Sequence, residues 1–382
     1  MLALSLTACS GDDDAEDTTA PNETTAATTT TLAIEHPLDD TLRLHQVLML
    51  GSHNSYKVYP YQQVLDGLRP DIPIVVAGLE YGHRPLTEQF DELGVRQIEL
   101  DVWADPEGGR YANPEYPATV GVEVPDLPEM HEPGFKVLHQ NEVDTQSTCP
   151  TFVQCLETVH EWSAAHPAHV PIVVLVEVKD AEADLAELQA LEAEIRSVFA
   201  EDEMVTPDDV RGSYSTLGEA VATDGWPTLA NVRGQVVFAL DNEGLRDAYR
   251  TGAPSLEGRV LFTPSRPGEP DAAFAKLNNP IGDADAITAA VAANMLVRTR
   301  ADADTIQARN NDTTTRNRAL TSGAQLISTD YMEPNPEFSD YSVQIPGGTP
   351  ANCNPANAPR ECKPTDVEDP ERMQASTGDS SS

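Results

Sequence analysis

Residues with the chemistry of acid–base catalysis follow several apolar segments of this chain. His53 and Asn54 lie in GSHNSY, directly after the apolar run VLML at 47–50, and His139 follows FKVL. A turn built from Gly, Ser and Asn is the plainer interpretation of GSHNSY, because a lone histidine is common at a surface. Two histidines beside carboxylates would instead supply a general base and a general acid. The elements that position these side chains must decide between the two interpretations.

Acidic residues recur at the ends of two further strand-like runs. Glu99 and Asp101 form the pair ELD within VRQIELDVW, and their spacing of two puts both on one face of a strand. Glu177 and Lys179 share a face in the same way. Glu99 alternates with apolar residues in a run that should be buried, and unpaired carboxylates almost never stay buried. A bound cation accounts for them. Together with Asn54 they offer only oxygen, which favours Ca²⁺ or Mg²⁺ over Zn²⁺.

The intervening pattern predicts the elements that carry these residues. Helical patterns occupy 149–166 and 180–200. Near-continuous Val/Ile/Leu runs are typical of a parallel sheet, and their alternation with helices indicates βαβ units. We therefore predict an α/β fold, a (β/α)8 TIM-type barrel of regular or irregular form, with its active site at the carboxyl ends of the strands. The predicted strands are 45–50, 95–103, 135–139, 171–178, 234–240, 259–262, 294–299 and 323–329.

Composition divides the chain into four parts. Residues 1–9, MLALSLTAC, resemble the end of a bacterial lipoprotein signal whose LTAC lipobox would make Cys9 a lipidation site, although a basic n-region is missing. Residues 10–35 are Thr-rich and predict a disordered tether. We assign 36–363 to a single catalytic barrel domain and 364–382 to a disordered tail.

The other four cysteines indicate an oxidising compartment. Cys149 lies close to Cys155, and Cys353 lies close to Cys362, so two local disulfides are the natural pairing among three possible connectivities. A zinc site is the alternative, but neither pair has CxxC spacing. We therefore expect an exported protein, either extracellular or anchored by lipid at the cell surface.

The charge balance excludes several kinds of partner. Acidic residues outnumber basic ones 63 to 24, which gives a formal net charge of −39. This balance argues against nucleic-acid binding and against electrostatic docking on anionic bilayers. It is compatible with cation binding. We expect a monomer without an obligate protein partner.

The quoted segments, in this order and spacing, lead to a resemblance. GSHNSY, GVRQIELDVW, PGFKVLHQNEVDTQSTC and PIVVLVEVKD resemble the calcium-dependent phosphatidylinositol-specific phospholipase C family found in bacteria. LVRTRADADT and GAQLISTDY are similar to that family's last two strands, so the resemblance runs from about 42 to 332. It implies a Ca²⁺ cofactor and a phosphatidylinositol substrate at a membrane or micelle surface.

The resemblance also implies roles for individual residues. His53 matches the general base that acts on the inositol 2-hydroxyl, and His139 matches the general acid that protonates the diacylglycerol oxygen. The implied products are diacylglycerol and inositol 1,2-cyclic phosphate. The implied calcium ligands are Asn54, Glu99, Asp101 and Glu177.

Four more residues are candidates for binding the substrate. Lys179 shares a face with Glu177 and could hold the phosphate, or it could pair with a neighbouring carboxylate. Arg298 and Arg300 lie on one face of a late strand, and Tyr331 follows the next strand. We predict that these side chains contact the headgroup.

Three other functions remain open at this point. Glycerophosphodiester phosphodiesterases share the barrel, the two histidines and the acidic pair, but Arg-Gly normally follows their first histidine, where this chain has Asn54-Ser55-Tyr56. Sphingomyelinase D-like lipases are a second barrel relative, which uses Mg²⁺. The third is a calcium-binding surface lipoprotein without turnover, against which the presence of both histidines argues.

Overall fold

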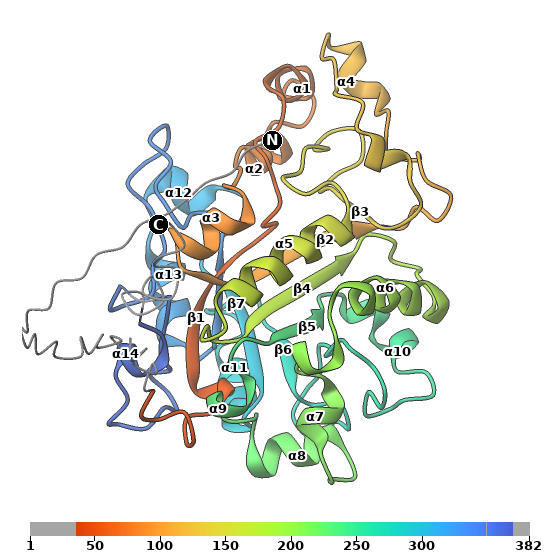
Figure 1. Cartoon of the computed structure of the whole chain (residues 1–382). Coiled ribbons are helices and arrows are strands. Elements are labelled where there is room, and N and C mark those ends of the chain that lie inside the picture. Colours follow the sequence, from red (N-terminus) through yellow and green to blue (C-terminus); the bar gives the residue numbers. More distant parts are fainter. Residues whose placement is uncertain (1–35, 349, 370–382) are drawn as a thin grey trace, which may run out of the picture. The chain divides into compact units, whose positions relative to one another are not determined.

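Parallel strands form the centre of the structure, a computed structural model that describes residues 36–348 and 350–369 (Figure 1). Their order in the sheet is β5-β4-β2-β1-β8-β7-β6. Two parallel bridges, Ala239 to Phe262 and Pro264 to Phe274, join the outer strands and nearly close the barrel. The predicted α/β barrel is thus confirmed. The seven strands are β1 (Val47–Ser52), β2 (Val95–Trp103), β4 (Ile172–Val178), β5 (Val236–Leu240), β6 (Phe274–Lys276), β7 (Leu296–Arg300) and β8 (Leu326–Thr329).

Burial explains why these runs form strands. All six residues of β1 are buried, as are the first eight of the nine in β2, so both faces of the sheet are covered. Such strands need apolar side chains on both faces. In β4 only Glu177 is partly exposed, because it lies near the carboxyl end of its strand.

One predicted strand is absent, and another is short and antiparallel. Residues 259–262 form no strand, because this segment contributes only one isolated bridge, from Phe262 to Ala239. Residues 135–139 contain only the short β3 (Lys136–Val137), which pairs antiparallel with the end of β2. A parallel strand needs a crossover back to the far end of the sheet, whereas 104–135 returns to the end of β2 from which it left. The strand β6 was not predicted.

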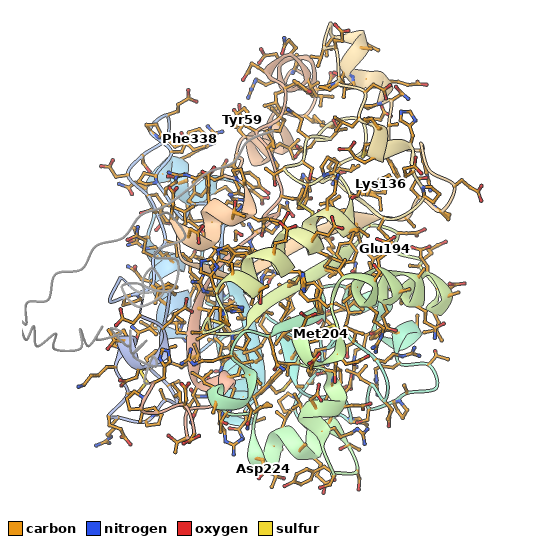
Figure 2. The ribbon with its side chains drawn as sticks, in the orientation of Figure 1. Tyr59, Lys136, Glu194, Met204, Asp224 and Phe338 are labelled. Atoms are coloured by element: carbon orange, nitrogen blue, oxygen red, sulfur yellow. A yellow bond between two sulfur atoms is a disulfide. The ribbon has the colours of Figure 1, made fainter. Side chains whose placement is uncertain are left out.

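Helices cover the outside of the barrel, and the two that were predicted are present as α5 and α6. Thr151 begins α5 with a capping box that it shares with Gln154, and Asp184 caps α6 by accepting from the backbone of Glu187. No helix among the described residues is long and apolar enough to cross a membrane. Figure 2 places Tyr59 and Asp224 at opposite ends of the barrel, the former at the carboxyl ends of the strands.

The remaining elements complete the described chain. A short strand, β9 (Ala351–Cys353), pairs antiparallel with β1. The α-helices are α1 (Gln62–Leu68), α2 (Pro73–Leu79), α3 (Leu86–Asp91), α4 (Glu115–Thr119), α5 (Phe152–Ala165), α6 (Leu185–Val198), α7 (Pro207–Arg211), α8 (Leu217–Asp224), α9 (Leu229–Val232), α10 (Arg246–Tyr249), α11 (Ala284–Ala292), α12 (Ile306–Asn310), α13 (Thr314–Thr321) and α14 (Pro364–Val367). The 3₁₀ turns are Leu44–Gln46, Pro128–His131, Glu201–Glu203 and Glu243–Leu245.

The structure corrects the predicted domain boundary at 364. Residues 364–367 form α14, and Glu368 is fully buried against Arg96 at the start of β2. A buried carboxylate with an arginine partner holds this segment in the body of the protein, so residues 364–368 are not part of a disordered tail. The predicted lipidation site Cys9 and tether 10–35 lie outside the described residues, as does 370–382.

Both predicted disulfides are present. Cys149 pairs with Cys155 at the start of α5, and Cys353 pairs with Cys362 after β9. No zinc site is needed to account for these cysteines.

Candidate functional site

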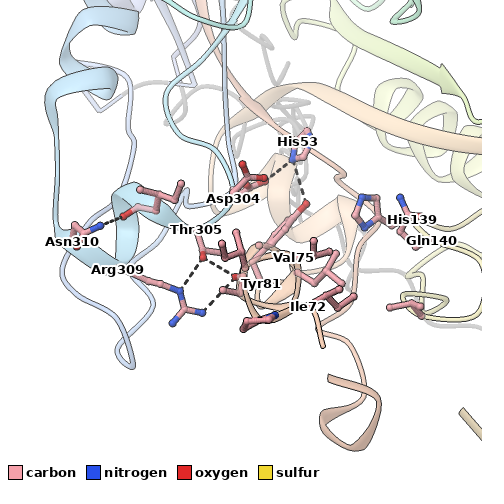
Figure 3. Close-up of a pocket in the computed structure, with 18 residues that line it drawn as sticks. His53, Ile72, Val75, Tyr81, His139, Gln140, Asp304, Thr305, Arg309 and Asn310 are labelled. Atoms are coloured by element: carbon pink, nitrogen blue, oxygen red, sulfur yellow. Dashed lines mark hydrogen bonds and ion pairs between the residues drawn. The ribbon is translucent and has the colours of Figure 1, made fainter. Parts of the chain in front are cut away.

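A cavity of about 800 Å³ opens at the carboxyl ends of the strands, and both predicted catalytic histidines line it (Figure 3). Segments far apart in the sequence meet here. Its lining comprises His53, Ile72, Pro73, Ile74, Val75, Ala77, Gly78, Leu79, Tyr81, His139, Gln140, Val143, Asp304, Thr305, Ile306, Arg309, Asn310 and Asp330.

The GSHNSY segment has the turn that its composition predicts, and this turn aims the histidine. A Cβ at Gly51 would lie 1.9 Å from Gln97 Oε1, so any larger residue here would displace the buried Gln97 side chain of β2. Asn54 has a φ of 48°, a left-handed conformation that asparagine tolerates. Ser55 donates its N–H to the Glu99 carbonyl at 2.9 Å, and its hydroxyl accepts from Glu99 N at 2.8 Å. The loop is therefore fastened directly to the strand that carries the acidic pair.

Hydrogen bonds determine which nitrogen of His53 can accept a proton. Its Nδ1 lies 2.7 Å from Asp330 Oδ1, and its Nε2 lies 3.2 Å from a guanidinium nitrogen of Arg300. Because a carboxylate only accepts, we assign the ring proton to Nδ1 and the lone pair to Nε2. Burial and the nearby Arg300 lower the pKa of His53 to about 3, although Asp330 opposes this shift. The ring is therefore neutral near pH 7 and can act as a base.

A basic side chain keeps the carboxylate partner of His53 charged. Arg300 donates to Asp330 Oδ2 at 2.9 Å. Burial alone would raise the pKa of Asp330, but its interactions with His53 and Arg300 hold that pKa below its usual range. His139 has an equivalent arrangement, since its Nδ1 lies 2.8 Å from Asp144 Oδ2.

Asp144 is itself held by a buried lysine. Lys57 Nζ lies 3.1 Å from Asp144 Oδ2, and both side chains are fully buried. Lys57 also donates to the backbone carbonyls of Leu79 and Tyr81. The lysine therefore fixes Asp144, which in turn orients His139 with Nε2 available to the cavity.

The predicted acidic residues converge as one cluster. One carboxylate oxygen from each of Glu99, Asp101 and Glu177 lies within 4.8 Å of the others. Asp101 faces Glu177 in the register of β2 and β4. Burial raises the pKa of Glu99 to about 7 despite the opposing charge of Arg298. Burial and then the charge of Glu177 raise the pKa of Asp101 well above its usual value. Such a cluster is costly unless a cation is bound.

Unpartnered oxygens indicate that the residues fit a hard metal ion. Within the part of the chain that the structure describes, Asn54 Oδ1 and Asp101 Oδ1 are buried without a hydrogen-bond partner. The Asn54 amide group donates to Tyr81 OH at 2.8 Å, which leaves the amide oxygen free to bind a ligand. With Glu99 and Glu177 these atoms form the all-oxygen donor set that calcium prefers.

The four predicted substrate-binding residues have different partners: three pair with residues of the site, and Tyr331 does not. Lys179 donates to Asp101 at 3.1 Å and to Glu177 at 3.4 Å, which is the carboxylate pairing considered from the sequence. Arg298 is 1% exposed and donates to Glu99 at 2.5 Å, so it holds a proposed ligand. Arg300 holds His53 and Asp330, as described above. Tyr331 lines another cavity, of about 420 Å³, whose lining includes Tyr81 and Asp330 but not His53.

Sequence reasoning missed the residues that orient the histidines. Asp330 directly follows β8, so the carboxyl-end rule applied to this strand would have found it. Asp144 lies five residues after His139, close enough for a loop to bring them together. Lys57 and Tyr81 carried no signal, because the contacts of a buried lysine and a buried tyrosine depend on packing.

Comparisons with known proteins agree with this geometry. The family model of calcium-dependent phosphoinositide phospholipase C matches residues 42–355, which is most of the chain. No curated protein matches the sequence.

Solved structures share the fold. A calcium-dependent phosphoinositol-specific phospholipase C from Pseudomonas sp aligns with a TM-score of 0.54 at 15% identity, over 83% of this chain and 97% of that chain. The same enzyme titled as a myoinositol complex aligns with a TM-score of 0.53 at 16% identity, over the same shares of 83% and 97%. At these identities the likeness supports the barrel architecture alone.

Proposed function

Because this chain belongs to the calcium-dependent phosphoinositide phospholipase C family, we propose that it cleaves phosphatidylinositol to diacylglycerol and inositol 1,2-cyclic phosphate. One observation carries the proposal. Two histidines, each oriented by a buried carboxylate, line one cavity at the carboxyl ends of the strands. Beside them lies a donor cluster made only of oxygen.

His53 is the proposed general base. Its Nε2 takes the proton of the inositol 2-hydroxyl as that oxygen attacks the phosphorus. Asp330 accepts the hydrogen bond from Nδ1–H and stabilises the imidazolium that forms, while Arg300 keeps Asp330 ionised. Tyr81, whose hydroxyl lies 3.3 Å from Nδ1, stacks on the ring of His53 and holds it in place.

His139 is the proposed general acid. It protonates the glycerol oxygen as the bond from phosphorus to that oxygen breaks, so the leaving group departs as neutral diacylglycerol. Asp144 stabilises the protonated ring before transfer, and Lys57 fixes Asp144. Lys179, which pairs with Asp101 at the edge of the acidic cluster, is the proposed contact for a phosphoryl oxygen.

Asn54, Glu99, Asp101 and Glu177 are the proposed ligands of calcium, the family's metal. When bound, Ca²⁺ lowers the pKa of a hydroxyl that it contacts and offsets negative charge on the phosphoryl group. Arg298 holds Glu99 on the side of the cluster that faces β7.

We also propose that the protein is exported and acts as a monomer. Its two disulfides are typical of an oxidising compartment. Labelling cells with a palmitate analogue, in the wild type and in Cys9→Ser, would test the lipid anchor. Label on both proteins would exclude Cys9 as the anchor site.

The activity itself is tested by comparing substrates. The protein is incubated with phosphatidylinositol, sphingomyelin or glycerophosphocholine, each with Ca²⁺ or EGTA, and the products are identified by ³¹P NMR. We expect inositol 1,2-cyclic phosphate from phosphatidylinositol and its loss in EGTA. Products from only the other two substrates would exclude the proposed specificity, and equal activity in EGTA would exclude the metal.

A further inference from the structure

Two basic side chains contact the acidic cluster formed by Glu99, Asp101 and Glu177. Arg298, in β7, donates to Glu99 at 2.5 Å. Lys179, directly after β4, lies 3.1 Å from Asp101 and 3.4 Å from Glu177. All three carboxylates belong to the proposed calcium ligands. Cationic groups of the protein therefore contact the same side chains that the metal ion would bind.

The two cations differ in how firmly they are held. Arg298 is 1% exposed, and besides the cluster it donates to Asn278 at 2.5 Å and to Ser328 at 3.2 Å. Among the residues that the structure describes, Lys179 has no side-chain acceptor other than the acidic cluster. Its side chain is 13% exposed at the carboxyl end of β4. Arg298 is thus fixed by several acceptors, whereas the Lys179 side chain can leave the cluster.

The position of Lys179 allows its side chain to move while its backbone stays in place. Its backbone N–H donates to the carbonyl of Val102 at 2.9 Å, which holds this residue beside β2. Lysine carries a compact charge on a flexible stem, so the ammonium group can rotate away. Two positive groups beside the same buried carboxylate repel each other, and the side chain of Asp101 is fully buried. The ammonium group and a divalent cation therefore oppose each other at this cluster.

We propose that Lys179 competes with calcium for Asp101 and Glu177, and that this competition sets the calcium affinity of the site. When the ion binds, the ammonium group leaves the carboxylates and contacts a phosphoryl oxygen of the substrate instead. The inference rests on the proposed function, which supplies both the metal and the phosphate. Carboxylate pairing and phosphate binding, which the sequence leaves as alternatives for Lys179, become two successive states of one side chain.

Calcium affinity is measured on the whole protein by isothermal titration calorimetry, with Ca²⁺ alone and without lipid. The protein is first freed of metal with a chelating resin. Lys179→Met removes the ammonium group and keeps most of the apolar stem. It should bind calcium about 10- to 100-fold more tightly than the wild type, a factor typical of coupling between two binding events. Lys179→Arg keeps a positive charge and should bind calcium no more tightly than the wild type does.

Two further variants separate competition from a general loss of positive charge. Lys179→Gln is uncharged but can still donate a hydrogen bond to Asp101, and it should also bind calcium more tightly. The matched control is Lys276→Met, which removes a lysine that ends β6 and pairs with Asp241 at 2.6 Å. Because Asp241 is not a proposed ligand and separated charges are screened, this variant should change the calcium affinity less than about threefold.

Two outcomes of these titrations would overturn the proposal. The first is calcium binding by Lys179→Met and Lys179→Gln that is no tighter than that of the wild type. The second is equal tightening by Lys276→Met, which would mean that the charge of the whole region, and not competition for two ligands, sets the affinity. Thermal unfolding in EGTA shows which variants are folded, and if Lys179→Met does not fold, Lys179→Gln decides.

Release of the ammonium group to the substrate is tested with a second ligand. Calcium-saturated protein is titrated with myo-inositol 1-phosphate and, as a control, with myo-inositol. Lys179→Met should bind the phosphate about 10-fold more weakly than the wild type, the usual effect of losing a hydrogen bond to a charged group. It should bind myo-inositol as the wild type does. Equal affinity of the two proteins for the phosphate would contradict this part of the proposal.

The calcium titration also separates this proposal from the proposed function. If the wild type does not cleave phosphatidylinositol, the proposed function fails, but the comparison of calcium affinities still stands. If the wild type cleaves phosphatidylinositol and the uncharged variants of Lys179 bind calcium as it does, the function stands and the competition fails.

Discussion

The two ends of the barrel differ in how their buried polar groups are hydrogen-bonded. At the end where the strands begin, Arg96 donates to both oxygens of Glu368 and to the backbone carbonyls of Phe90 and Val95. His169 bonds Ser163 and the carbonyl of Val170. The hydrogen-bonding groups of these side chains thus find their partners within the protein.

At the end where the strands finish, polar atoms are left over. Asn54, Asp101, Asp144 and Asp241 each have a buried oxygen without a hydrogen-bond partner among the residues described. Unmet hydrogen bonds destabilise a fold, so these four oxygens at the carboxyl ends of the strands are a cost that a ligand can offset. The comparison teaches that the first end maintains the fold and the second end is built for a ligand. Variants at the two ends should therefore affect different measurements.

The largest effect should come from the histidines at the mouth. His53→Ala or His139→Ala should each lower kcat by about 10²- to 10⁴-fold, the usual contribution of a general base or acid. Stability should change little, since both side chains are partly exposed at the cavity. Turnover of phosphatidylinositol and urea unfolding would be measured for both variants.

A substrate with a good leaving group separates the two roles. Nitrophenyl phosphoinositol needs little protonation of its departing oxygen, so it should restore turnover by His139→Ala and not by His53→Ala. Equal rescue of both variants would show that the assigned roles are wrong.

The next largest effect should be on stability, at the opposite end. Glu368→Gln leaves Arg96 charged and poorly paired in a fully buried position, which should cost about 3–5 kcal/mol of unfolding free energy. The kcat of the folded fraction should be unchanged, because Glu368 lies far from the mouth along β2. Urea unfolding would measure the loss of stability. Turnover normalised to the concentration of active sites would measure kcat.

Truncation sharpens this prediction. A chain ending at 363 lacks α14 and Glu368 and should be destabilised, whereas a chain ending at 369 should match the full protein. Equal stability of the two truncated chains would mean that the pair contributes nothing to the fold.

Loss of a proposed calcium ligand should have a smaller effect. With Ca²⁺ at about 100 times its Kd, the wild type should gain about 2.7 kcal/mol of stability. Asp101→Asn should gain much less. In EGTA this variant should be as stable as the wild type, because burial and Glu177 raise the pKa of Asp101 and an amide resembles its neutral form.

Thermal unfolding with and without Ca²⁺ checks this result. Asp247→Asn is the matched control, since its side chain is 94% exposed and should respond to calcium as the wild type does. A full calcium response by Asp101→Asn would remove it from the proposed ligands.

The smallest expected effect is the pH dependence of stability that comes from His169, at the end where the strands begin. Burial lowers the pKa of His169 from 6.5 to about 4. In the unfolded chain the ring gains a proton as pH falls below 6.5, whereas in the fold it stays neutral until about pH 4. Its contribution to stability is therefore complete above 6.5 and is lost as pH falls toward 4, by about 1–2 kcal/mol at pH 5.

Unfolding by urea at pH 7 and pH 5 measures this loss. His169→Gln should lose less stability between these two values than the wild type does. His131→Gln, at a side chain that is 45% exposed, should behave like the wild type. If His169→Gln showed the full wild-type loss, other groups would have to account for the pH dependence.

The sequence by itself predicted six of the seven parallel strands and the acidic residues that lie close together at their carboxyl ends. Continuous apolar runs predicted β1, β2, β4, β5, β7 and β8, because a strand buried on both faces needs them. The spacing of two between Glu99 and Asp101 predicted that they share a face, and the cysteine spacing predicted two local disulfides. These features depend on local periodicity and short loops, which are visible in a linear chain.

Only the tertiary structure decided the partners of these residues. Asp330 reaches His53 across 277 positions of sequence, because β8 lies beside β1 in the sheet. Arg298 and Arg300, which were predicted to contact the headgroup, pair with Glu99 and Asp330. A charged group in a buried site must pair with whichever opposite charge the strand order brings next to it. The strand order depends on contacts between segments far apart in the sequence, so no local sequence pattern can predict it.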